Sequence, residues 1–60
     1  MAIINGDSND NTLIGTVADD LIIGFGGDDT LVGEAADDTL AGSSGNDYLE
    51  GEGNNDTLSG

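Results

Sequence analysis

The chain has 60 residues and a formal net charge of −13, and it contains no Cys, His, Lys or Arg. A disulfide framework and a Cys/His zinc site are therefore excluded, and nucleic acid and anionic membrane surfaces are disfavoured as partners because their binding depends on basic side chains. No apolar segment approaches the roughly 20 residues of a membrane-spanning helix, so we expect no membrane insertion. Because nothing in the chain neutralises its carboxylates, we expect a cation as partner and a metal-free state that is prone to disorder.

A predicted partial strand at residues 1–5, "MAIIN", precedes a series of glycines spaced nine residues apart. The glycines are Gly6, Gly15, Gly24, Gly33, Gly42, Gly51 and Gly60. When each unit is numbered from its glycine, position eight is always aliphatic. These residues are Leu13, Ile22, Leu31, Leu40, Leu49 and Leu58, with Ile4 in the same phase. Repetition in a fixed register predicts a single domain over residues 1–60 built from about six nine-residue repeats, which begin at Gly6 and at every ninth residue up to Gly51.

Each repeat divides into a loop and a short strand. Positions one to six are rich in Gly, Asn, Asp, Ser and Ala, which favour turns, whereas positions seven to nine are triplets such as "TLV" with an apolar centre. A helix is excluded because a glycine in every unit would weaken it by about 1 kcal/mol each time. Strands of three residues are stable only when they pair with copies of themselves, so the sequence predicts an all-β solenoid.

Carboxylate and amide side chains recur at two adjacent loop positions. Position six is Asn11, Asp20, Asp29, Asp38, Asp47 and Asp56. Position five is Asp10, Asp19, Asp28, Asp37, Asn46 and Asn55. Ca²⁺ takes about six to eight oxygens from carboxylates and carbonyls in irregular geometry, which suits a glycine-rich loop.

The segments "GGDDTL", "SGNDYLEG" and "NNDTLSG" resemble the RTX (repeats-in-toxin) nonapeptide family, whose pattern is G-G-x-G-x-D-x-U-x with bound Ca²⁺. The resemblance implies a right-handed parallel β-roll with two repeats per coil, so that loops on one edge are two periods apart. It also implies several Ca²⁺ ions between neighbouring loops, held by loop carbonyls and by the position-six side chains. The implied metal ligands are Asn11, Asp20, Asp29, Asp38, Asp47 and Asp56. We expect the position-five carboxylates to be solvated rather than direct ligands.

The loops depart from the family pattern at two positions. Position two is never glycine, and position four is alanine at Ala18 and Ala36. Because alanine resists positive φ, we expect the loops at Gly6, Gly24 and Gly42 to bind Ca²⁺ better than those on the opposite edge.

Other functions find less support in the residues. A catalytic carboxylate dyad is disfavoured because equivalent Asp pairs recur in several repeats, so we expect no enzymatic activity. An EF-hand starting at Asp7 would need Gly at Thr12 and Glu at Ala18, and a phosphate-binding loop at "GFGGDD" would lack its Lys. The outward apolar residues of the first half, among them Ile14 and Ile23, fit either β-propensity or a contact surface.

We therefore expect a secreted, extracellular structural protein whose folding depends on Ca²⁺. In one interpretation, the chain is a subunit that associates with itself head to tail into a filament, because both ends of the roll expose strand edges. In the alternative, it is a repeat block of a larger secreted toxin, protease or adhesin. The missing polar caps and the outward apolar residues favour the first interpretation.

Overall fold

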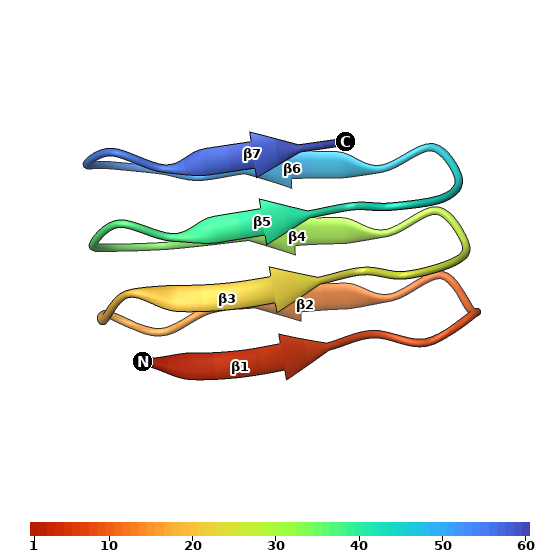
Figure 1. Cartoon of the computed structure of the whole chain (residues 1–60), viewed down its shortest axis with the longest axis horizontal. Helices are drawn as coiled ribbons and strands as arrows, with labels where there is room; N and C mark the ends of the chain where they lie inside the picture. The colour runs from red at the N-terminus through yellow and green to blue at the C-terminus, as the bar shows by residue number, and fades with distance from the viewer.

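The computed structural model describes residues 1–60 as seven short parallel strands joined by loops, with no helix. The strands are β1 (Ala2–Asn5), β2 (Thr12–Ile14), β3 (Asp20–Ile23), β4 (Thr30–Val32), β5 (Thr39–Ala41), β6 (Tyr48–Glu50) and β7 (Thr57–Ser59). The odd-numbered strands form one sheet and the even-numbered strands form a second sheet behind it (Figure 1). In the absence of helices, no segment meets the length and hydropathy of a membrane-spanning helix.

The sheets are parallel because successive repeats alternate between them. Each residue pairs with the one two repeats later, so that Ile4 lies beside Ile22, and Ile22 lies beside Leu40. The chain runs to the right in the front sheet, returns to the left in the back sheet and rises steadily, which makes the coil right-handed (Figure 1). The predicted right-handed β-roll with two repeats per coil is confirmed.

The core is a narrow stack of position-eight side chains between the sheets. Ile22, Leu31 and Leu40 are completely buried, and the aliphatic residues beyond them are only partly covered. At the C-terminal end, the Leu58 side chain is 47% exposed because no further coil lies on it. The core is therefore complete in the middle of the roll and open at its ends.

Hydrogen bonds between coils continue from the strands into the loops. The N–H of the position-one glycines from Gly6 to Gly42 donates to the position-nine carbonyl of the next coil, as Gly33 does to Glu50 at 2.8 Å. The position-seven N–H donates to the position-six carbonyl of the coil beneath, as Tyr48 does to Asp29 at 2.8 Å. Each coil therefore has hydrogen-bond donors and acceptors that point towards the coil above it and towards the coil beneath it.

The last four loops share a backbone conformation that the first two loops lack. Position two is left-handed at Phe25, Glu34, Ser43 and Glu52, with φ of 67–70°. Position four is left-handed at Gly27, Ala36, Gly45 and Asn54, with φ of 70–89°. The expectation that alanine would keep position four out of this region is wrong at Ala36, where φ is 70°. Loop conformation therefore changes along the chain rather than from one edge of the roll to the other.

Candidate metal centre

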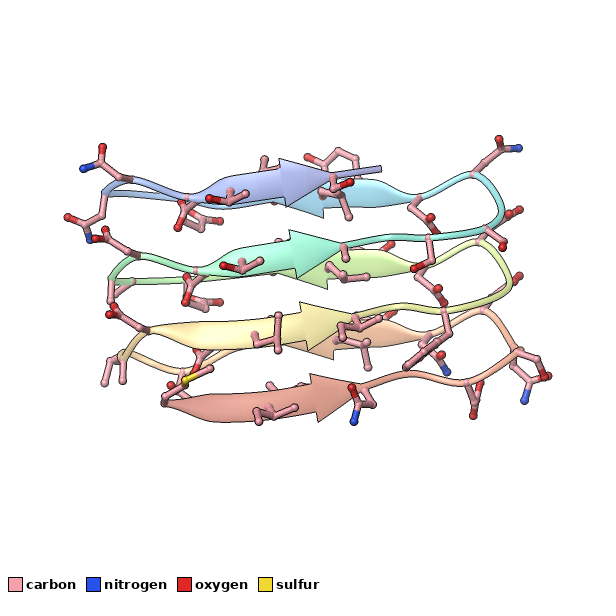
Figure 2. The ribbon with its side chains drawn as sticks, in the orientation of Figure 1. Atoms are coloured by element: carbon pink, nitrogen blue, oxygen red, sulfur yellow. The ribbon has the colours of Figure 1, made fainter.

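Oxygen-bearing side chains gather along both loop edges of the roll (Figure 2). We call the edge formed by the loops at residues 6–11, 24–29 and 42–47 the first edge, and the edge formed by the loops at residues 15–20, 33–38 and 51–56 the second edge. On the first edge, the position-six residues Asn11, Asp29 and Asp47 occupy successive coils. On the second edge, Asp20, Asp38 and Asp56 do the same. The structure thus arranges the six predicted ligands in two columns of three.

One oxygen of each position-six carboxylate is used to join the coils. Asp29 Oδ1 accepts the backbone N–H of Asn11 at 2.7 Å, and Asp47 Oδ1 accepts that of Asp29 at 2.8 Å. On the second edge, Asp38 Oδ1 accepts the N–H of Asp20, and Asp56 Oδ1 accepts that of Asp38, both at 2.8 Å. These bonds turn each side chain into the interior, towards the preceding coil.

The second oxygen is buried without a hydrogen-bond donor in three loops, namely at Asp29, Asp38 and Asp47. Each of these Oδ2 atoms lies beside the glycine that opens its own loop. A Cβ at Gly24 would sit 2.6 Å from Asp29 Oδ2 and 3.1 Å from the carbonyl oxygen of Gly42. Glycine therefore leaves room for a carboxylate oxygen and a carbonyl oxygen to approach the same place.

This donor set suits a hard cation. A buried carboxylate oxygen without a donor carries a large desolvation cost unless a positive charge lies next to it. No three acidic side chains converge anywhere in the roll, so an ion between two loops would take one or two carboxylates and complete its shell with carbonyls and water. The residues present therefore fit Ca²⁺, which accepts mixed oxygen ligands in irregular geometry.

The electrostatics of the second edge differ between coils. Desolvation is the main cause that raises the pKa of Asp38, and the neighbouring Asp20 and Asp56 charges raise it further. At Asp20 the backbone N–H of Thr16 donates to the carboxylate and lowers its pKa below the usual value. Asp38 thus lacks the hydrogen bond from its own loop that stabilises the Asp20 carboxylate.

The first two loops satisfy their position-six side chains with donors of their own. The N–H of Thr16 donates to Asp20 Oδ2 at 2.6 Å, and the Thr16 hydroxyl also donates to this carboxylate. In the first loop, the N–H of Asp7 donates to Asn11 Oδ1 at 2.9 Å. Asn11 and Asp20 therefore lie in the predicted columns, but they do not present a free buried oxygen. The sequence signal that we missed is Thr16, whose hydroxyl donates to the position-six carboxylate of its own loop.

Position five forms a second set of bonds between coils that sequence analysis also missed. Asp10 Oδ1 accepts the N–H of Asp28 at 2.8 Å, and Asp28 Oδ1 accepts that of Asn46 at 2.8 Å. Asp19 and Asp37 do the same on the second edge. All four carboxylates are exposed, and each reaches towards the following coil. Their recurrence beside position six was the available signal.

Comparison with known proteins agrees with this geometry. The family model of the RTX calcium-binding nonapeptide repeat, which describes four copies of the repeat, matches residues 5–40 and 32–60. No curated protein and no solved structure matches the chain. The family match covers nearly all of the chain and coincides with its coils, loops and carboxylate columns. The chain therefore belongs to the RTX family of calcium-binding nonapeptide repeats.

Proposed function

We propose that the chain is an extracellular structural module, not an enzyme, which folds when Ca²⁺ binds and then associates with itself head to tail. The observation that carries the metal dependence is the set of buried oxygens without donors at Asp29, Asp38 and Asp47. In the metal-free roll these charges would be desolvated and uncompensated. Metal binding would therefore contribute directly to the free energy of folding.

The proposed ions lie between neighbouring loops of the same edge. On the first edge, Asp29 and Asp47 border one such space, and on the second edge Asp38 and Asp56 border another. The loops at residues 6–11 and 15–20 contribute less, because Asn11 is uncharged and Asp20 already has internal donors. We therefore expect the strongest binding in the last four loops, where positions two and four are left-handed.

A matched pair of substitutions tests this assignment. Asp28 and Asp29 are adjacent, and each accepts one backbone N–H through Oδ1, a bond that an Asn side chain can preserve. Only Asp29 has a buried second oxygen. Asp29→Asn should lower the calorimetric number or affinity of bound Ca²⁺, whereas Asp28→Asn should leave both nearly unchanged.

Folding is followed in the same samples by far-ultraviolet circular dichroism. The unsubstituted chain should lack β-signal in chelator and gain it as Ca²⁺ reaches roughly 0.1–1 mM, the range of extracellular modules. A full β-signal in chelator would refute calcium-dependent folding. Equal calcium binding by Asp28→Asn and Asp29→Asn would refute the assigned ligands.

Self-association is proposed because both ends of the roll are unfinished. Leu58 is 47% exposed at one end, and Ile4 is only partly buried at the other. A second copy presents the complementary surface to each end, and a contact of this kind that does not close produces an open filament. Extracellular action fits the need for Ca²⁺, which is scarce in the cytoplasm. Electron microscopy should show filaments with Ca²⁺ that chelator dissolves.

The same exposed ends support the alternative that the chain is a repeat block of a larger secreted protein. Further coils of one polypeptide would then cover Ile4 and Leu58. Sedimentation distinguishes the two proposals, because a folded, calcium-loaded chain that stays monomeric at high concentration favours the alternative.

A further inference from the structure

We propose that successive copies of this chain stack with a half-turn about the roll axis, so that β1 of the upper copy pairs with β6 of the lower copy and β2 pairs with β7. This inference rests on the proposed head-to-tail association and specifies its register. The front sheet of one copy would then continue into the back sheet of the next copy.

The first argument is the number of strands. Four strands lie in the front sheet and three in the back sheet, so the chain makes three and a half coils and its uppermost strands are β7 in front and β6 behind, half a coil lower (Figure 1). The next vacant place along the coil is therefore in the back sheet, above β6. A copy turned by half a turn puts β1 in that place and β2 above β7, with all strands still parallel.

An upper copy without this rotation cannot pair with both of the uppermost strands, β6 and β7. If its β1 lies above β7 in the front sheet, its β2 lies in the back sheet one coil higher than the place directly above β6. One strand place above β6 then stays vacant, and Leu49 is left without an aliphatic neighbour above it. If its β2 lies above β6 instead, its β1 must occupy the place of β7. The half-turn is therefore the register in which both β6 and β7 pair with a strand of the upper copy.

Backbone groups match in the half-turn register. Within the chain, the Gly33 N–H donates to the Glu50 carbonyl, and the Tyr48 N–H donates to the Asp29 carbonyl. Continuing this pattern, the Gly51 N–H meets the Asn5 carbonyl of the next copy, and the Asp47 carbonyl meets the Ile3 N–H. The stack therefore repeats bonds that already join coils inside one copy.

The side chains at the junction also match. Leu49 and Leu58 receive Ile4 and Leu13 of the next copy, which are the aliphatic residues left partly covered at its lower end. On the second edge, Asn55 comes to lie beneath Asp10 of the next copy, and Asp56 beneath its Asn11. Each of these contacts places an amide against a carboxylate.

The charge pattern favours this register for a physical reason. Inside the roll, some stacked pairs bring like charges together, as Asp10 does beneath Asp28, whereas others place an amide against a carboxylate, as Asp28 does beneath Asn46. At the half-turn junction, both position-five and position-six pairs are of the second kind. Asn55 can accept the Asp10 N–H of the next copy, as Asp37 accepts the Asn55 N–H within one chain at 3.0 Å.

Cysteine cross-linking distinguishes the registers, because the chain has no cysteine of its own. Ile3 and Tyr48 are 64% and 60% exposed, lie on opposite sheets of one copy, and would be direct neighbours across the half-turn junction. Thr57 would be the neighbour of Ile3 only in the unrotated stack. Directly opposed residues of parallel strands lie within the Cα spacing of about 4.4–6.8 Å that a disulfide requires.

Two double variants are oxidised with diamide in Ca²⁺ and run on denaturing gels without reductant. Ile3→Cys with Tyr48→Cys should give a ladder of covalent oligomers, and Ile3→Cys with Thr57→Cys should stay monomeric. A ladder from the second variant alone, or equal ladders from both, overturns the half-turn while the proposed assembly stands. Circular dichroism checks that both variants fold.

Imaging of the unsubstituted chain gives an independent test. Three and a half coils at about 4.8 Å each predict a rise of about 17 Å per copy with a half-turn, whereas the unrotated stack with its vacant strand place predicts about 19 Å. Helical reconstruction that gives the longer rise without rotation overturns the inference. Absence of any filament overturns the proposed assembly, and the half-turn with it.

Discussion

Truncation of a fully buried position-eight residue should lower the stability of the calcium-loaded roll far more than the same change at its open end. Leu40 has no exposed surface and packs in one cluster with Ile22 and Leu31. Leu40→Ala removes the transfer free energy of the side chain and leaves a cavity that the flanking coils cannot fill. Leucine-to-alanine changes at such sites cost about 2–5 kcal/mol.

Leu58 is the matched control, since it has the same residue type, repeat position and sheet. Its side chain is 47% exposed, which leaves about half of the transfer term, and the open end leaves no closed cavity. We therefore expect Leu58→Ala to lower the free energy of unfolding by about 1 kcal/mol. This loss is smaller than that of Leu40→Ala by about 1 kcal/mol or more. For a chain of this size, each 1 kcal/mol shifts Tm by roughly 4–8 °C.

The assay is thermal unfolding followed by circular dichroism at saturating Ca²⁺, in dilute samples that sedimentation shows to be monomeric. The melting temperature of Leu40→Ala should lie clearly below that of Leu58→Ala. Equal losses in monomeric samples would refute the stacked core, because they would mean that both leucines are covered to the same extent.

Two further predictions concern the loops and the pH dependence of the fold. Gly45→Ala should destabilise the roll, because its Cβ would collide with the backbone carbonyl of Gly27, whereas Gly53→Ala has nothing within 4 Å and should be nearly neutral in the same unfolding assay. Desolvation raises the pKa of Asp38 above 3.8, so its contribution to the metal-free fold is present below pH 3.8 and lost as the pH rises through the raised pKa. A backbone hydrogen bond lowers the pKa of Asp20, so its contribution is present above pH 3.8 and lost on further acidification. The β-signal of metal-stripped protein should therefore increase as the pH falls from neutral towards 3.8 and decrease again at lower pH, and a decrease throughout would contradict the burial of Asp38.

The period of the sequence was sufficient to predict a solenoid of stacked strands, whereas its handedness and its two repeats per coil were implied by the resemblance to the RTX family. A repeat of nine residues with one aliphatic residue at position eight can bury that residue only if like positions stack. With two repeats per coil, this stacking places Ile22 beside Leu40 and Leu31 beside Leu49. Position-six side chains then stack for the same reason. The stacking of like positions therefore follows from spacing alone, and the register of the sheets follows once the two repeats per coil implied by the RTX resemblance are added.

The conformation of individual loops could not be predicted in this way. Residue preferences disfavour a left-handed Ala36, but its φ is 70° in the roll. Conversely, the side chain of Thr16 closes its loop by bonding to Asp20, an interaction that depends on exact distances within the turn. Residue preferences alone therefore do not decide the conformation of these loops.

Two sets of side-chain bonds join each coil to its neighbours. Position five reaches forward, as Asp10 does to Asp28, whereas position six reaches back, as Asp29 does to Asn11. Each coil therefore depends on its neighbours on both sides for its backbone partners and for the carboxylate that faces its loop. A Ca²⁺ ion between two loops would reinforce both sets of bonds at once, because it fixes the same adjacent coils. Since the end coils lack half of these partners, a second copy and a bound ion would stabilise them in the same way, which would couple metal binding to the proposed assembly as well as to folding.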